Sequence, residues 1–244
     1  MRALTTTALL AAWERGLSQS PTQRALTLVA LACAEMPAER LAALSIGERD
    51  AHLLSMRESA FGPEMSGTVA CPACSQQLEL NFTVADMRMA APPDMALPAM
   101  LTRGEYEVEF RLPNSDDVAA LGAEMDASAN KRRLLERCLL SARRNGEAIT
   151  VDRLPAELVA AVSERMAATD PQGDVQLSLN CPDCGHCWEA PMDIVSYLWT
   201  EIHAWATRLL RDIHALASAY GWREAEILAL GPWRRQAYLE MIDQ

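Results

Sequence analysis

Two pairs of cysteines carry the clearest chemical signal in this sequence. One pair bounds the CPAC sequence at residues 71–74, and the other bounds the CPDC sequence at residues 181–184. Two thiolates three positions apart in a tight turn can face the same ion, and two such turns supply the four sulfurs of a tetrahedral zinc site. Four sulfur ligands leave no open coordination position, so the metal would stabilise the fold and not catalyse a reaction. The pattern predicts a structural Zn2+ bound by Cys71, Cys74, Cys181 and Cys184.

Other uses of the cysteines stay open at this level. More than one hundred residues separate the two pairs, against the roughly 15–20 usual between paired units, but their matched CPxC form favours one shared site. Cys187 forms a competing CxxC pair with Cys184, and His186 offers a nitrogen ligand. A redox function is a rival, although redox CxxC motifs normally begin a helix in an α/β unit, which neither pair is expected to do. Cys33 and Cys138 lie on apolar helical stripes and are expected to be ordinary buried residues.

The remaining residues do not suggest an enzyme. The sequence contains no HExxH helix, no GxSxG nucleophile turn and no GxxxxGK[ST] phosphate loop. His203 and His214 fall on one helical face but would lie about 16 Å apart at ~1.5 Å per residue, too far to share an ion. We therefore expect no catalytic residue and no small-molecule substrate.

Composition and charge exclude further classes of function. Half of the 244 residues are hydrophobic, which is enough to build a core. The net charge of -11 leaves no general surface for phosphates, so no nucleic-acid partner is predicted. The longest uncharged apolar run, residues 25–34, is about half the ~18 residues of a membrane span, so no membrane partner is expected. The first residues lack a signal-peptide cleavage site, and the cysteines suit a reducing cytoplasm.

Hydrophobic periodicity indicates the elements that must position the cysteines. Apolar residues recur at helical spacing in one set of segments and alternate with polar residues in another. The patterns predict helices over residues 1–62, 115–144 and 154–166, and strands over 78–82, 106–112 and 175–179. Ser115, Asp116 and Asp117 are expected to cap the helix that follows them. The glutamates of the second strand are expected to face solvent.

The C-terminal part is predicted to be one long amphipathic helix followed by two short ones. From 192 to 220 apolar residues recur every three or four positions, and Gly221 is a natural stop. Short helices are expected over 222–230 and 233–242. Residues 87–100 are rich in Ala, Met and Pro and are expected to form a linker.

Together these patterns predict a mostly helical α+β protein in three parts. The first is helical, residues 1–62. The second, residues 63–191, is a small zinc-ribbon-like sheet with a helical insertion at about 115–170. All predicted strands are expected to lie in that one sheet, which closes around the cysteines. The third, residues 192–244, is the long helix with its short helical foot.

Aromatic and basic residues gather near the C-terminus. Such residues are frequent anchors of protein interfaces. The candidate partner-binding residues are Trp222, Leu228, Trp233, Arg234, Arg235 and Tyr238. The alternative is that the two tryptophans hold the short helices against the long one. Glutamates close by cancel the local positive charge, which disfavours nucleic acid.

Several short motifs, in this order, resemble a known family. They include GERD at residues 47–50, FRLP at 110–113, CPDCGHCW at 181–188 and YGWREAEIL at 220–228, in addition to the first CPxC. The chain is similar to the T4-type baseplate hub assembly chaperones of contractile phages and phage-derived contractile injection systems. Ser75, where Gly is common, and the Gly231-Pro232-Trp233 sequence depart from the family pattern.

The resemblance implies a non-enzymatic chaperone for the baseplate hub, stabilised by structural zinc. Its partners would be hub or spike proteins, and it would act in the cytoplasm of a bacterial cell or phage-infected host. A permanent structural baseplate component is an alternative, which the same sequence would serve. An unrelated zinc-ribbon adaptor between proteins is another, but a basic face would be expected for it, and the residues around both cysteine pairs are neutral or acidic, as at Asp183 and Glu189.

Overall fold

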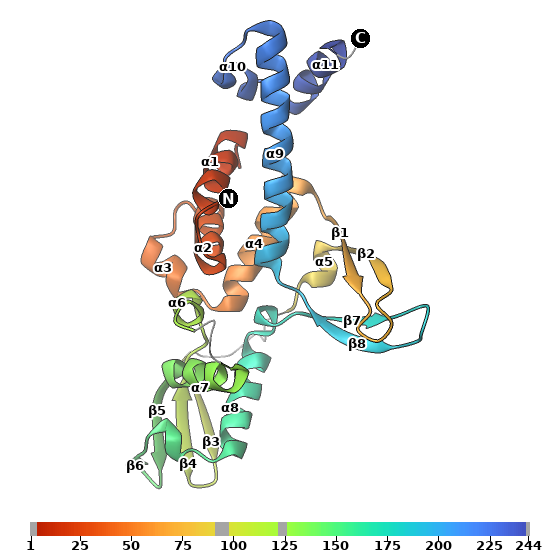
Figure 1. Ribbon diagram of the computed structural model, residues 1–244. Coiled ribbons are helices and arrows are strands. Elements are labelled where there is room, and N and C mark those ends of the chain that lie inside the picture. The colour runs from red at the N-terminus through yellow and green to blue at the C-terminus, as the bar shows by residue number, and fades with distance from the viewer. Residues whose placement is uncertain (1–3, 91–97, 122–125, 243–244) are drawn as a thin grey trace.

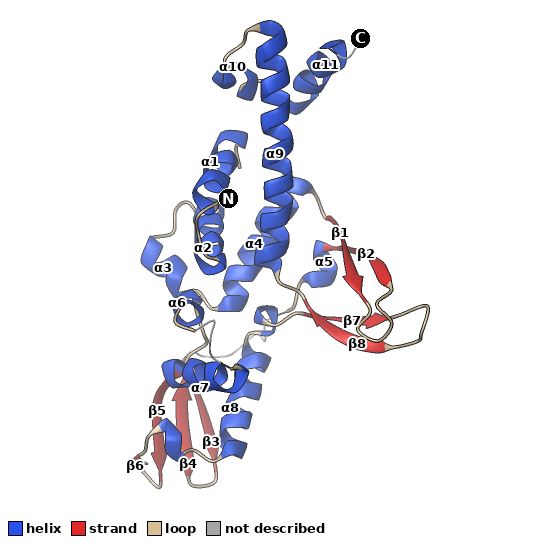
Figure 2. Ribbon diagram, viewed as in Figure 1, coloured by secondary structure: helices blue, strands red, loops and turns tan. Residues whose placement is uncertain are grey.

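A long helix organises the protein. The structure is a computed structural model that describes residues 4–90, 98–121 and 126–242. The long helix carries two short helices at one end, and two β-hairpins and a separate α+β lobe lie near its other end (Figures 1 and 2). Helices predominate, and the sheets of the described residues are antiparallel. The prediction of a mostly helical α+β fold is confirmed.

Four helices form the N-terminal part, as predicted. They are α1 (Thr6–Gly16), α2 (Pro21–Ala32), α3 (Ala38–Ala43) and α4 (Ile46–Phe61). Ser20 and Ser45 begin α2 and α4 with capping boxes, in which the serine side chain accepts from a backbone N–H and Gln23 or Glu48 reaches back. These local interactions set where the helices start.

The long helix α9 (Ile194–Tyr220) covers this N-terminal group and buries one apolar face on it. The buried side chains recur every three or four residues: Ile194, Leu198, Ile202, Ala206, Leu209, Ile213 and Leu216. Each of the buried Ile and Leu side chains contributes about 1.5–3 kcal/mol. Gly221 ends the helix in the left-handed conformation with φ 68°, as predicted. Two short helices follow, α10 (Glu224–Leu228) and α11 (Pro232–Ile242).

Two separate hairpins carry the cysteine pairs. The first joins β1 (Glu64–Ala70) to β2 (Gln77–Thr83), and the second joins β7 (Gln176–Asn180) to β8 (Cys187–Pro191). Each is a two-stranded antiparallel sheet. A short helix, α5 (Val84–Met87), follows the first hairpin. The sequence pattern predicted β2 and β7 but missed β1, because only Met65 is buried on that strand.

Between the hairpins lies the insertion, which has its own sheet and core. The four strands are ordered β3 (Ala99–Arg103), β4 (Tyr106–Phe110), β5 (Leu139–Arg144) and β6 (Glu147–Ala148). The helices of the insertion are α6 (Ser115–Ala119), α7 (Ala127–Cys138), η1 (Val151–Arg153), α8 (Ala156–Thr169) and η2 (Pro171–Gly173). Val108, Phe110, Leu135 and Val162 belong to a buried cluster separate from the main core.

This sheet corrects two predictions. The strand at 106–112 does not join the cysteine hairpins, because β4 pairs with β3 and β5. Residues 139–144 are a strand and not the end of a helix. Leu135, Leu139 and Ala142 fit helical spacing, but pairing of β5 with β4 outweighs that local pattern. The glutamates of β4 lie on its more exposed face, as predicted.

Two further predictions need adjustment. The cap of α6 is Asn114, one residue earlier than expected, and Asp117 closes its capping box. Of the predicted linker at 87–100, residues 91–97 lie outside the described residues, and β3 already begins at Ala99. The proposed division at residues 62 and 191 stays a prediction. No helix in the described ranges combines the length and the apolarity needed to cross a bilayer.

Backbone contacts hold the insertion against the N-terminal helices. The N–H of Ile46 donates to the carbonyl of Pro113 (3.1 Å), and the N–H of Gly47 donates to the carboxylate of Asp170 (2.8 Å). A Cβ on Gly47 would lie 1.9 Å from Oδ1 of Asp170 and 2.9 Å from the backbone nitrogen of Gly173. The GERD motif thus begins with a residue that leaves room for Asp170.

We expect Gly47→Ala to lower the free energy of unfolding by about 1–3 kcal/mol through this overpacking. In an ordinary helix, Gly→Ala would raise the free energy of unfolding by up to about 1 kcal/mol, so a decrease indicates the clash with Asp170. Urea unfolding measures the change. Gly67→Ala is the control, because no atom lies within 4 Å of the added Cβ. Equal stability of the two variants would contradict the contact.

Asp117 is a fully buried carboxylate at the base of the insertion. It accepts hydrogen bonds from Arg111 (2.5 and 2.9 Å), Arg137 (2.9 Å) and the backbone N–H of Asn114 (3.0 Å). Burial alone would raise the pKa of Asp117, but the hydrogen bonds from Arg111, Asn114 and Arg137 outweigh it and lower the pKa to about 2. Arg111 belongs to the FRLP motif, which therefore fixes α6 and α7 to the sheet.

Because the folded pKa of Asp117 lies below its usual value, its contribution is complete above about pH 5 and is lost as the pH falls toward 2. Asp117→Asn should lower the free energy of unfolding by about 2 kcal/mol at pH 7. The difference from the wild type should shrink at pH 3. Urea unfolding at both pH values measures this, and a difference independent of pH would refute the assignment.

Candidate metal centre

The two hairpin tips build the same turn around each cysteine pair. In the first, the N–H of Cys71 donates to the carbonyl of Gln76 and the N–H of Ser75 donates to the carbonyl of Cys71, both at 2.8 Å. In the second, Cys181 and Gly185 make the corresponding bonds at 2.9 Å. The CPxC sequence thus folds locally into a turn that brings its two thiols to one side.

Ser75 adopts the left-handed backbone conformation that its glycine counterpart adopts. Its φ is 63°, and that of Gly185 is 72°. A side chain other than glycine carries a cost of roughly 1–2 kcal/mol in this region. The departure from the family pattern therefore leaves the shape of the turn intact.

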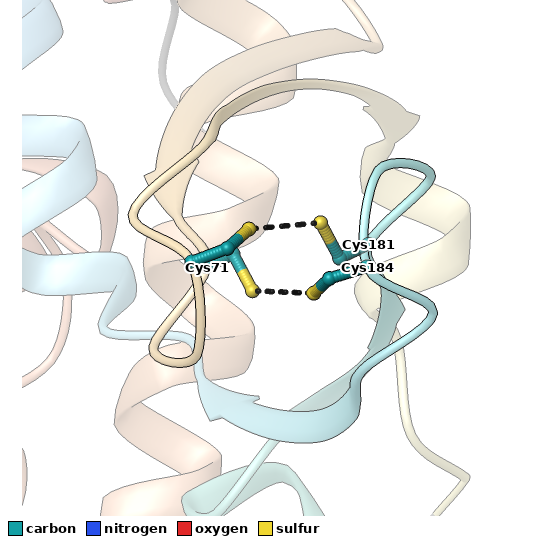
Figure 3. Close-up of side chains that lie close together, drawn as sticks. Cys71, Cys181 and Cys184 are labelled. Atoms are coloured by element: carbon teal, nitrogen blue, oxygen red, sulfur yellow. Dashed lines mark hydrogen bonds between the residues drawn. The ribbon is translucent and has the colours of Figure 1, made fainter.

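The tips face each other, so the four sulfurs converge (Figure 3). Sγ of Cys71 lies 3.7 Å from Sγ of Cys184, and Sγ of Cys74 lies 3.6 Å from Sγ of Cys181. All four lie within 4.8 Å of one another. Disulfides have S–S distances of about 2.05 Å, so none is formed. A tetrahedral site with Zn–S bonds of about 2.3 Å has sulfurs about 3.8 Å apart, close to the 3.7 and 3.6 Å of the two contacts between the tips.

The thiols are not equivalent. Cys71 and Cys181 are buried, and Cys74 and Cys184 are exposed. Burial raises the pKa of Cys71, but the N–H groups of Cys74 and Ala73 outweigh it and bring it to about 7. The N–H of Gln76 lowers the pKa of Cys74, but the thiols of Cys184 and Cys181 outweigh it and raise it to about 12. Four adjacent thiols resist joint ionisation without a cation, and a divalent ion would relieve this.

Side chains of α4 and α9 hold the first hairpin in place. Arg57 donates to both carboxylate oxygens of Glu201 (3.0 and 2.7 Å) and to the carbonyl of Gly62 (2.6 Å). The hydroxyl of Tyr197 donates to the carbonyl of Ser66 (2.9 Å) and accepts from its N–H (3.0 Å). The second hairpin leads directly into α9. Both tips are therefore positioned by the same end of one helix.

The alternative ligands lie outside the cluster. The sulfur of Cys187 accepts from the amide of Asn180 (3.3 Å), and the ring of His186 stacks on Trp188. Cys138 is buried as expected, whereas Cys33 is only partly buried. Arg57 and Tyr197, which position the site, had no assigned role from the sequence.

The six C-terminal candidates occupy different environments. The ring of Trp222 stacks on Tyr220 and meets Tyr238 edge-on, with ring centres 4.7 and 4.9 Å away. Arg235 is buried, and Leu228 is half-buried. Arg234 is exposed, and Trp233 is 86% exposed. The cluster thus has an internal part that holds the foot together and an external part led by Trp233.

The protein is mostly helical, and two hairpins that are far apart in its sequence meet at a four-thiol centre suited to a structural metal. A family model described as T4 bacteriophage base plate protein matches residues 6–193. That is more than half of the chain, and the protein belongs to this family. Helices α9, α10 and α11 follow the matched segment. Comparison with curated proteins and with solved structures gave no significant match.

We expect the purified chain to hold one Zn2+ and Cys181→Ser to release it, because three thiols cannot close a four-sulfur site. The free energy of unfolding should fall by at least about 3 kcal/mol. Metal analysis and thermal unfolding measure both effects. Cys187→Ser is the matched control and should keep the metal. Full metal content in Cys181→Ser would rule out the predicted ligand set.

Proposed function

We propose that this protein is a non-enzymatic assembly chaperone for the baseplate hub of a contractile phage tail or phage-like injection system. Membership of the baseplate family is the observation that carries the proposal. The protein would bind hub or spike subunits in the cytoplasm of the bacterial cell or infected host.

The metal centre supports a stabilising role for zinc. Its four thiols would close the coordination sphere, so the ion would have no position for a substrate. The two hairpins are far apart in sequence, and their tips meet at the thiols. Zinc would lock them together, so that the helices on either side present their surfaces rigidly.

The external part of the foot supports a protein-binding role. Trp233, Ala237 and Met241 follow each other at four-residue intervals on α11, so they share a face. Trp233 is 86% and Met241 61% exposed. The opposite face of the same helix carries the buried Arg235 and the partly buried Tyr238 and contacts α9. Exposed tryptophan on a helix that is anchored from behind is a typical interface anchor.

A permanent structural component of the baseplate would share the family and the surface. The two functions differ in where the protein is found. The chain should be tagged in its native cell, and the proteins that co-purify should be identified separately from the soluble fraction and from sedimented particles. Hub or spike subunits in the soluble fraction, with particles free of the chain, support the chaperone. Sedimentation with particles would identify a structural component instead.

Trp233→Ala should weaken association with the hub or spike subunit at least tenfold and leave the free energy of unfolding within about 0.5 kcal/mol, because the side chain touches little of its own fold. Pull-down titration and urea unfolding measure the two quantities. Trp222→Ala is the contrasting variant and should mainly lower stability, since its ring is stacked. If Trp233→Ala binds the subunit as tightly as the wild type, the two short C-terminal helices are not part of the interface.

A further inference from the structure

The insertion has an open apolar cavity between its two longer helices. Helices α7 and α8 lie beside the strands of the insertion (Figure 1). The cavity has a volume of about 390 Å3, within the range of ligand-binding pockets. Its apolar lining includes Leu135, Leu139, Val151, Leu154, Val159 and Val162. The second core therefore continues into a hollow that reaches solvent.

The rim of this cavity has more positive than negative charge, in contrast to the acidic chain. Lys131 and Arg132 line it from α7, and Asp152 lines it as well. Arg132 pairs with Asp152 (2.6 Å) and more weakly with Glu136 (3.5 Å). Lys131 is exposed and forms no ion pair with the residues that the structure describes. Arg137, on the same helix, forms an ion pair with Asp117. An unpaired cation thus stands beside an apolar hollow in a protein of net charge -11.

We propose that this cavity binds an acidic amphipathic segment of a partner protein. An apolar side chain of that segment would fill the hollow, and a neighbouring carboxylate would pair with Lys131. Charge complementarity selects such a segment over a basic one. Only the assignment of the segment to a baseplate subunit rests on the proposed function.

The sequence offers a selective chemical test. Lys131 is the only lysine among the 244 residues. A carbodiimide joins a carboxylate directly to an amine, so in the purified complex a cross-link that uses a lysine of this chain can arise only at Lys131. We expect it to reach an Asp or Glu flanked by apolar residues in the partner. Lys131→Arg keeps the charge and should bind equally but lose the cross-link. Cross-links from Lys131 only to carboxylates of its own chain would overturn the proposal.

A second arm does not need the baseplate partner. The probe is a helical peptide of leucines and glutamates, and its control has lysines in place of the glutamates. Methyl NMR of the full zinc-loaded chain should show the acidic probe shifting Leu135, Leu139 and Val159, and the basic control leaving them unchanged. Lys131→Glu should weaken the acidic probe about tenfold or more. Ala156→Trp, at the exposed mouth, should abolish its binding, with an unchanged spectrum elsewhere showing that the variant folds.

The outcomes separate the two proposals. If no baseplate subunit co-purifies but the acidic probe binds, the proposed function fails and the cavity assignment stands. If neither peptide shifts the cavity methyls, or both shift them equally, the cavity proposal fails regardless of the co-purification result. Decanoate binding in place of the peptide would also overturn it, because the cavity would then take a small amphiphile.

Discussion

The contact between two cysteine turns is the constraint on which the arrangement of this protein depends. Each hairpin is only two strands long, and an isolated hairpin of that kind is marginally stable in water. Each gains support from α9 on one side and from the opposing thiols on the other. The insertion begins and ends between them, so a metal ion bound by the four thiols would close a loop of about one hundred residues and would stabilise the fold by restricting the unfolded chain.

The insertion adds a second layer of polar contacts to this frame. Asp170 occupies the space that Gly47 leaves free, and Pro113 receives the N–H of Ile46. Asp117 then connects the strand side of the insertion to α6 and α7 through two arginines. Residues far apart along the chain therefore fix the insertion relative to α4. A lobe held in this way presents its cavity rim in a defined orientation.

Charge distribution gives the two surfaces different characters. The chain is acidic overall, yet α7 places its lysine next to an apolar hollow. Helix α11 exposes Trp233 and Met241 far from it, at the opposite end of α9 (Figure 1). Two separated surfaces suit a protein that contacts its baseplate partners at more than one point. Neither surface lies at the thiol centre.

The sequence by itself determined the features that depend on short-range patterns. Matched CPxC turns identified the four clustered cysteines, apolar spacing identified α9, and Gly221 marked its end, because turn chemistry and helical periodicity involve residues within about four positions. Tertiary structure decided the rest. Residues 139–144 became a strand through pairing with β4, the insertion acquired its own sheet, and Gly47 met Asp170, more than one hundred positions away. Such contacts depend on which distant surfaces fit together, which local periodicity does not record.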